Sequence, residues 1–381
     1  MEVASSAANC PEHPPEGGAH GLVAERTRRG RCVLVEADGT IWVSHHLALL
    51  RSRDDGVTWQ RAAALPTPRW RRAIQTSRLA CRLLRHEVRA LAALEDGTLV
   101  AADRRGIYVG RAGTALMAPS RVAAGPLPLL PPLCIGTAPG GRVVFGEYGS
   151  PRPKRPMRIF ASSDGGHSFA PVHAFGAGEI LHVHNVVWDA GRAHWWVLTG
   201  DFDPEPGIGI LSADLRRFEW LARGEQRFRA VAVFDAGDRL VYATDSQLEC
   251  NALISLDKDS GRTERLRPFD GSCIYACRFG GLFALSTTVE PSSVNRSPFA
   301  ELWVSRDLDR WHRVLAARKD RWDADWFQFG SLVLPRGESG REVLAVSGQA
   351  VERLDGRVWI GRLEATNAED GAETWTTSPR S

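Results

Sequence analysis

The sequence has no long hydrophobic run and no excess of one charge. Its longest apolar stretch, residues 126–135, is interrupted by prolines and is too short for a membrane-spanning helix. The 48 basic and 45 acidic residues leave a formal net charge of +3, which excludes both a nucleic-acid-binding tail and an acidic solvating chain. We therefore expect neither a membrane nor a nucleic acid as a partner.

Paired cysteines are also missing. The seven cysteines are scattered without a C-x-x-C pair, and the two nearest ones, Cys273 and Cys277, have no histidine partner. This spacing argues against a structural zinc site and favours reduced, buried thiols. Residues 1–20 lack the basic start and the apolar run of a secretory signal, so we expect a cytoplasmic location.

Helical periodicity is nearly absent, and residues 70–84 form the one candidate helix. Elsewhere, short β-branched or aromatic runs are bounded by Gly, Asp or Pro, which is typical of many short strands. Both ends of the chain are polar. We therefore predict one folded domain at residues 21–364, with a disordered tail at residues 1–20 and a flexible tail at residues 365–381.

The short strands belong to an internal repeat. Residues 86–103 and 226–245 each read as a strand, a turn with glycine, a second strand and a closing acid. The same outline recurs along the chain, and its closing acids are Asp103, Glu147, Asp201, Asp245 and Glu290.

A second signal lies later in the repeat. Residues 52–59 (SRDDGVTW) and 162–169 (SSDGGHSF) both fit the pattern S-x-D-x-G-x-[ST]-[WF]. Residues 212–218 and 305–311 keep the Ser-x-Asp start and the aromatic end but lack the glycine. The pattern suits a tight hairpin, because Ser and Asp oxygens accept backbone N–H groups, glycine adopts positive φ and the aromatic ring fills the gap between sheets.

These segments resemble Asp-box (BNR) repeats, and the chain resembles the sialidase-like Asp-box β-propeller superfamily. Residues 147–290 also resemble bacterial Asp-box proteins with GEY, H-x-H and TGD elements. The resemblance implies an all-β propeller of four-stranded antiparallel blades. Candidates for the innermost strand lie near residues 32, 88, 134, 182, 229, 273 and 330, so we predict seven blades. Six blades is the alternative, because residues 88–122 lack the Ser-x-Asp pattern and the last repeat, at residues 330–363, is short.

A propeller brings two points of each repeat to the same mouth of the central channel. The first strand of a blade starts at that mouth and the second strand ends there, while the Ser-x-Asp hairpin lies at the opposite face. We therefore expect one cluster of polar side chains. Its catalytic candidates are Glu147, Asp201, Asp245 and Glu290, and its substrate-binding candidates are Arg89, Tyr148, His182, His184 and Arg229.

Facing carboxylates are the groups that glycoside cleavage requires, one protonated and one ionised. We assign this chemistry to Glu147 with Asp201 or Asp245, and expect arginines to bind the carboxylate of an acidic glycan. A sialidase is disfavoured because no FRIP-like element precedes residues 52–59, and a lyase is the less favoured enzyme class. The alternative is a non-catalytic propeller that binds a glycan or a protein, with arginine–carboxylate pairs fastening its blades. The H-x-H spacing of His182 and His184 suits a metal, but from the sequence we assign neither a metal nor a cofactor.

Overall fold

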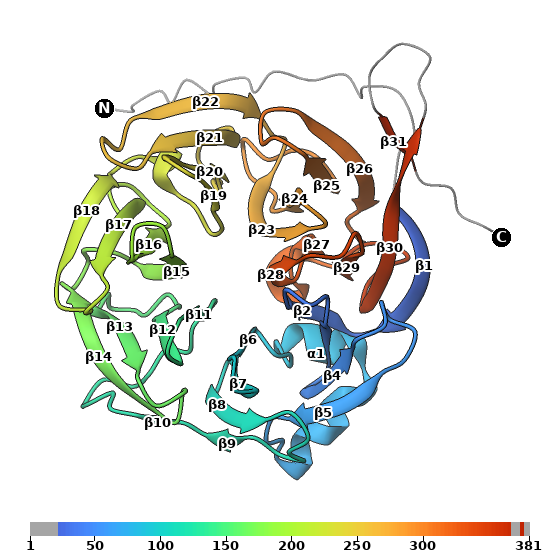
Figure 1. The fold of residues 1–381 in the computed structure, drawn as a ribbon, viewed down its shortest axis with the longest axis horizontal. Helices are drawn as coiled ribbons and strands as arrows, with labels where there is room; N and C mark the ends of the chain where they lie inside the picture. Colours follow the sequence, from blue (N-terminus) through green and yellow to red (C-terminus); the bar gives the residue numbers. More distant parts are fainter. Residues whose placement is uncertain (1–21, 367–373, 377–381) are drawn as a thin grey trace.

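The computed structural model describes residues 22–366 and 374–376 of the chain. It is an all-β structure in which small antiparallel sheets follow one another around a central channel, as in a propeller (Figure 1). The predicted tail at residues 1–20 lies outside the described residues. Of the predicted tail at residues 365–381, the described residues belong to two paired strands, β30 (Arg357–Thr366) and β31 (Thr374–Thr376).

Consecutive strands pair antiparallel in groups of four around the ring. The first groups are β2 (Arg31–Val35), β3 (Ile41–His45), β4 (Ala48–Ser52) and β5 (Gln60–Ala64); β6 (Ala90–Ala93), β7 (Thr98–Asp103), β8 (Gly106–Arg111) and β9 (Ala118–Pro119); and β11 (Gly136–Ala138), β12 (Arg142–Gly146), β13 (Met157–Ser162) and β14 (Ser168–Phe175). A short strand, β10 (Arg121–Val122), adds to β14 in parallel.

The next groups continue the same order. They are β15 (His182–Asp189), β16 (His194–Gly200), β17 (Gly207–Ser212) and β18 (Phe218–Arg223); β19 (Phe234–Ala236), β20 (Arg239–Ala243), β21 (Ala252–Asp257) and β22 (Thr263–Pro268); and β23 (Ser272–Phe279), β24 (Leu282–Val289), β25 (Phe299–Ser305) and β26 (Trp311–Arg318).

The last group joins the two ends of the chain. β27 (Gly330–Val333), β29 (Leu344–Gln349) and β30 supply three strands, and β1 (Leu22–Arg29) pairs with β30 as the fourth. The repeat pattern predicts a strand at residues 350–354 as well, but the structure has none there. Ala350 and Arg353 have positive φ angles, and the Ala350 N–H donates to Asp355 at 2.8 Å, so the segment is a turn.

The remaining elements are short. β28 (Arg336–Ser339) runs parallel to both β2 and β23 and links the first and sixth groups into one curled sheet. The candidate helix at residues 70–84 is confirmed as a 3-10 helix, η1 (Arg69–Thr76), followed by α1 (Arg78–Leu83). Two single turns, η2 (Gln226–Phe228) and α2 (Ala324–Phe327), complete the elements, and none of the described helices is long and apolar enough to cross a membrane.

The hairpins with the Ser-x-Asp pattern connect the third and fourth strands of their groups. In the β13–β14 hairpin, Ser162 Oγ accepts the Gly166 N–H at 2.8 Å, and Asp164 accepts both the N–H and the hydroxyl of Ser168, at 2.9 and 2.6 Å. The β4–β5 hairpin repeats these contacts with Ser52, Asp54 and Thr58. Each hairpin therefore satisfies its own polar groups.

The hydrophobic core lies between neighbouring sheets. Phe169, next to the β13–β14 hairpin, is 2% exposed and packs with Val100 and Ala102 of the preceding sheet. Inside the ring, a pocket of about 430 Å³ is lined by residues of several inner strands, including Val186 of β15. Five cysteines, Cys32, Cys81, Cys134, Cys273 and Cys277, are buried and free. Cys250 is disulfide-bonded, so the expectation of reduced thiols does not hold for it.

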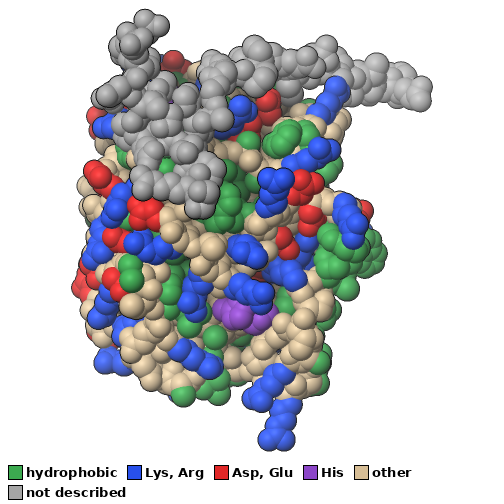
Figure 2. Space-filling model, turned by 90° about the vertical axis from the view of Figure 1, so that its right-hand side faces the viewer, with side chains coloured by type: hydrophobic (Ala, Val, Ile, Leu, Met, Phe, Trp, Pro, Cys, Tyr) green, Lys and Arg blue, Asp and Glu red, His purple; other side chains and the backbone are tan. Residues whose placement is uncertain are grey.

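The outer surface carries mixed charge. In the side view of Figure 2, basic side chains are spread over the visible face between acidic and apolar ones. This distribution agrees with the near-neutral net charge of +3.

Candidate functional site

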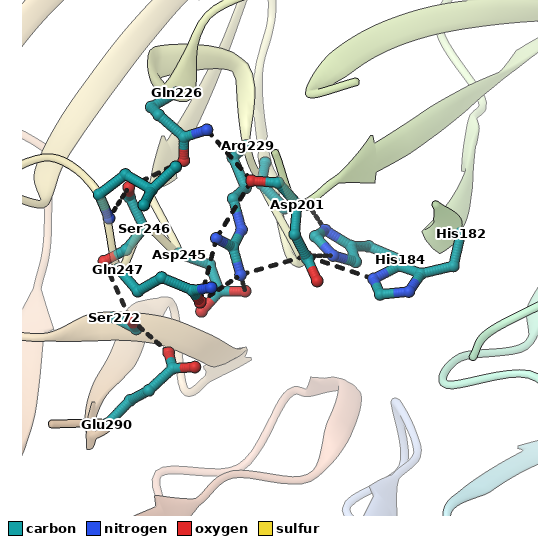
Figure 3. A network of polar contacts seen from close by, with 12 residues as sticks. His182, His184, Asp201, Gln226, Arg229, Asp245, Ser246, Gln247, Ser272 and Glu290 are labelled. Atoms are coloured by element: carbon teal, nitrogen blue, oxygen red, sulfur yellow. Dashed lines mark hydrogen bonds and ion pairs between the residues drawn. The ribbon is translucent and has the colours of Figure 1, made fainter. Parts of the chain in front are cut away.

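One mouth of the channel holds a continuous network of buried polar side chains (Figure 3). We call it the mouth cluster, and it consists of His182, His184, Asp201, Arg229, Asp245 and Glu290. The histidines stand at the start of β15, and Asp201 directly follows β16. Arg229 precedes β19, whereas Asp245 follows β20 and Glu290 follows β24. These positions are the starts of first strands and the ends of second strands, as the repeat predicts.

A β-bulge sets the direction of His184. In the β15–β16 ladder, Val183 pairs with Thr199 and Asn185 with Leu198, so His184 is the extra residue. Its ring and that of His182 both point at Asp201, with Nε2–Oδ1 distances of 3.0 and 3.3 Å. The two ring nitrogens and the carboxylate oxygen all lie within 4.8 Å of one another.

The other side of each ring is fixed by the backbone. His184 Nδ1 lies 2.9 Å from the carbonyl oxygen of Ala230, and His182 Nδ1 lies 3.2 Å from that of Gly149. Carbonyl oxygens only accept hydrogen bonds, so each Nδ1 carries a hydrogen and donates it. The neutral form of each ring therefore presents a bare Nε2 to the channel.

Asp201 and Asp245 share one guanidinium. Arg229 Nη2 lies 3.1 Å from Asp201 Oδ1 and 3.4 Å from Asp245 Oδ2, which places the two carboxylate oxygens within about 6.5 Å of each other. The side chains of Arg229 and Asp245 are 4% and 8% exposed. Asp245 Oδ1 and Arg229 Nε are buried and make no hydrogen bond with another described residue. The cluster thus contains unsatisfied polar atoms, which are costly unless a bound group uses them.

The acids of the cluster differ in their ionisation. Burial would raise the pKa of Asp201, but the imidazoles of His182 and His184 outweigh burial and hold that pKa well below its usual value. Burial raises the pKa of Asp245 well above its usual value; Arg229 opposes this shift, and the nearby carboxylates add to it. Burial also raises the pKa of Glu290, despite a 2.9 Å hydrogen bond from Ser272. One ionised acid therefore stands beside two acids that retain protons more readily.

Two further candidates border the cluster. The ring of Tyr148 lies 4.3 Å from that of His182, centroid to centroid, and the Arg89 guanidinium lies 5.5 Å from the centre of the Tyr148 ring. Burial raises the pKa of Tyr148 and lowers that of Arg89. Within the described residues Arg89 forms no ion pair, and its guanidinium donates a weak hydrogen bond to the Pro131 carbonyl at 3.4 Å. Arg89 thus has donors available for a ligand.

Glu147 is not brought into the cluster. Its side chain is fully buried and pairs with Arg158 at 2.7 Å and Arg155 at 2.9 Å, and it also accepts the Leu130 N–H. Glu147 directly follows β12 and pairs with Arg158 of the neighbouring strand β13, whereas the next residue, Tyr148, lies against the ring of His182. The carboxylate of Glu147 is thus occupied by two arginines, and no hydrogen bond or ion pair joins it to Asp201 among the described residues.

A second polar group, which the sequence reasoning missed, lies across the ring from β15. Arg31, at the start of β2, pairs with Glu87 at 2.8 Å and bonds the Tyr275 hydroxyl at 3.1 Å and Gln349 at 3.2 Å. Arg31 has the same place in its repeat as His182 has in its own, so the same rule could have found it. A pocket of about 370 Å³ borders this group and is lined by Arg31 and Glu87 among others.

The sequence matches no protein-family model and no curated protein. Solved structures with a similar fold include the extracellular domain of a putative one-component system from B. thetaiotaomicron (TM-score 0.54, 10% identity, 91% of this chain and 43% of that chain). A GH74 enzyme from Niastella koreensis has a TM-score of 0.53 at 10% identity over 94% of this chain and 55% of its own. A chain of the mitotic checkpoint complex has a TM-score of 0.53 at 10% identity over 95% of this chain and 98% of its own.

These similarities establish the fold alone, because the identities are low. The chain spans about half of the length of the B. thetaiotaomicron and Niastella chains. The similar structures thus come from a GH74 enzyme, an extracellular domain and a protein complex, which differ in kind although they share a propeller-like all-β fold.

Proposed function

We propose that the chain is a seven-bladed Asp-box propeller whose mouth cluster acts on a glycan with a negatively charged group. The seven groups of four paired strands support the blade count. The contacts within the β4–β5 and β13–β14 hairpins support the assignment of Asp boxes. The GH74 relative supports a link to carbohydrates at the level of the fold.

The observation that carries the proposal is the shared guanidinium of Arg229. It holds Asp201 and Asp245 within about 6.5 Å of each other, while the pKa of Asp201 is lowered and that of Asp245 is raised. Two neighbouring acids with opposite shifts are the usual arrangement for one proton donor and one ionised partner. We assign the donor role to Asp245 and the ionised role to Asp201, and we replace Glu147, whose carboxylate is occupied by two arginines.

Arg89 is the proposed contact for the charged group of the glycan. Its guanidinium lies beside Tyr148, close to the cluster, and forms no ion pair among the described residues. A planar guanidinium matches a carboxylate or sulfate with two parallel hydrogen bonds. The apolar face of the Tyr148 ring offers a surface against which a sugar ring can pack.

The test is turnover of aryl-glycosides and acidic oligosaccharides by matched variants. Asp245→Asn removes the proposed proton and should lower kcat by at least about 100-fold. The control is Asp103→Asn, because Asp103 is a buried acid at the same point of its repeat that pairs with Arg105 at 2.6 Å. Turnover in Asp245→Asn equal to that of the control would remove the catalytic assignment.

A non-catalytic, glycan- or protein-binding propeller is the second candidate. The observation in its favour is that Glu147 and Arg229 both serve as links between parts of the ring, as expected for structural pairs. This candidate predicts that the wild type turns over no substrate of the panel but binds an acidic oligosaccharide or a protein. In the glycan case, Arg89→Gln should weaken binding while leaving the melting temperature unchanged.

A further inference from the structure

We propose that His182, His184 and Asp201 bind a divalent transition-metal cation, with zinc as the first probe. The proposal goes beyond the proposed action on a glycan and does not depend on it. It also differs from the expectation based on the sequence, in which no metal was assigned.

The positions of the three ligand atoms fit a metal coordination sphere. Asp201 Oδ1 lies 3.3 Å from His182 Nε2 and 3.0 Å from His184 Nε2, and all three atoms lie within 4.8 Å of one another. With metal–ligand bonds of about 2.0–2.1 Å, neighbouring ligand atoms are about 3.3 Å apart in a tetrahedral shell and about 3.0 Å apart in an octahedral one. Two of the three separations therefore match such a shell, and the third, between the two nitrogens, is at most 4.8 Å.

The hydrogen bonds of the rings orient their lone pairs toward the same point. Both Nδ1 atoms face backbone carbonyls, of Gly149 and Ala230, so the neutral rings present bare Nε2 atoms. Metal-binding histidines use the same arrangement, in which the second nitrogen donates to a carbonyl or carboxylate. Neutral rings place two lone pairs against the Asp201 carboxylate, and this contact becomes favourable when a positive charge lies between them, either a ring proton or a metal ion.

One of these atoms is buried without a hydrogen bond. His182 is 2% exposed, and its Nε2 has no hydrogen-bond partner among the described residues, although it lies 3.3 Å from Asp201 Oδ1. A cation would satisfy this nitrogen, which is otherwise a costly buried acceptor.

Two imidazoles and one carboxylate select the type of metal. This set suits zinc, manganese, iron or cobalt, whereas magnesium and calcium prefer oxygen ligands alone. Three protein ligands leave coordination positions free, as in catalytic rather than structural sites. Arg229 also contacts Asp201 Oδ1, at 3.1 Å, and so shares this carboxylate with the proposed cation.

The experiment measures metal binding directly, without any glycan. The full chain is stripped with a chelator, dialysed, and titrated with zinc in the presence of a competing chromophoric chelator. We expect about one tight equivalent per chain and a higher melting temperature with zinc but not with magnesium. Cobalt should give visible absorption bands that zinc abolishes.

Two variants with matched controls locate the ion. Asp201→Asn and His182→Asn should each weaken zinc binding by roughly 100-fold or more. The controls are Asp203→Asn, which changes the acid two residues away that accepts from Gln226, and His173→Asn, a histidine on β14 outside the cluster. Both controls should retain the affinity of the wild type.

Three results would overturn the proposal. The first is the absence of a stoichiometric zinc equivalent in the wild type. The second is zinc binding by folded Asp201→Asn and His182→Asn variants at the affinity of the controls. The third, which needs no variant, is an X-ray absorption spectrum of the zinc-loaded wild type with sulfur ligands or without imidazole scattering. Asp245→Asn tests the other proposal through turnover, whereas zinc stoichiometry and the X-ray absorption spectrum are measured on the wild type, so the two proposals can fail separately.

Discussion

Carboxylates at the two faces of the ring differ in their hydrogen bonding and in their pKa. In the hairpins with the Ser-x-Asp pattern they are at least partly exposed and are hydrogen-bonded within the turn. Bonds from Thr58 lower the pKa of Asp54 to about 2. Burial would raise the pKa of Asp164, but bonds from Ser168 and Ser162 together outweigh it and lower that pKa to about 2. In the mouth cluster, burial raises the pKa of Asp245, and its Oδ1 lacks a hydrogen bond from any described residue. Both sets come from the same repeat.

The comparison shows where the fold has unused binding capacity. A hairpin acid is satisfied by residues two to four positions away, so it stabilises the turn and has nothing left for a ligand. An acid of the mouth cluster depends on side chains from other sheets for its hydrogen bonds and ion pairs, and these side chains do not satisfy all of its oxygen atoms. Glu147 tests this distinction, because it occupies a mouth position in the repeat but is satisfied like a hairpin acid.

The largest effect should come from the aromatic residue of a hairpin. Phe169→Ala removes a ring that is 2% exposed and packs against the preceding sheet, and should cost about 3–5 kcal/mol of unfolding free energy. Urea denaturation measures the loss, with the exposed Val57→Ala as a control. Metal binding at the cluster should persist in the folded fraction. A loss below about 1 kcal/mol would show that the hairpin ring does not hold neighbouring sheets together.

Glu147→Gln should lower the stability of the protein without lowering its turnover, because Glu147 holds two buried arginines and takes no part in catalysis. The change leaves Arg158 and Arg155 buried without their counter-charge, at a cost of about 3 kcal/mol. Chemical denaturation measures this cost, and the exposed Glu219→Gln serves as the control. Turnover per folded molecule, if the wild type has any, should equal that of the wild type. Unchanged stability combined with lost turnover would move Glu147 back among the catalytic acids.

Asp245→Asn should have the opposite effect on stability. Because the folded-state pKa of Asp245 is raised, its contribution is fully present below the unfolded pKa of about 4 and is lost as the pH rises through the folded pKa. The neutral amide should therefore stabilise the protein at pH 7 by about 1–2 kcal/mol and flatten the pH dependence. Melting temperatures from pH 4 to 9, compared with those of Asp103→Asn, check this. An unchanged slope would contradict a protonated Asp245.

The smallest effect belongs to the hairpin acid Asp164, whose folded pKa of about 2 lies below its unfolded value. The ionised Asp164 therefore stabilises the protein above about pH 4, and this contribution disappears as the pH falls toward 2. Asp164→Asn should cost less than about 1 kcal/mol at pH 7, because the group is exposed. The difference from the wild type should vanish in acid, and Asp309→Asn is the exposed control. A difference that persists at pH 2 would assign the effect to packing.

The sequence was sufficient to place His182, His184, Asp201 and Asp245 at one mouth, because strand alternation and repeat phase are local properties of the chain. It could not show that Arg155 and Arg158 turn back onto Glu147, since that pairing depends on the path of the loop between β12 and β13. Nor could it divide the acids into ionised and protonated ones, because that division depends on burial and on charges from other sheets.

The closing strand of the ring was missed for a similar reason. β1 reads LVAERTRR, a polar stretch with little alternation, and its partner β30 lies more than 300 residues away. Only the three-dimensional arrangement makes it a strand. The bulge at His184 was likewise invisible, because it depends on how β15 pairs with β16.

The pairing of β1 with β30 gives the ring a seam made from the first and last segments of the fold. On the ribosome, the strand that emerges first must wait for partners that are synthesised last, so the circle cannot close until translation of the propeller is nearly finished. Until then, the last sheet cannot cover the apolar face of the first sheet, β2–β5. This face therefore stays accessible to a chaperone for longer than the faces between sheets that are synthesised one after the other.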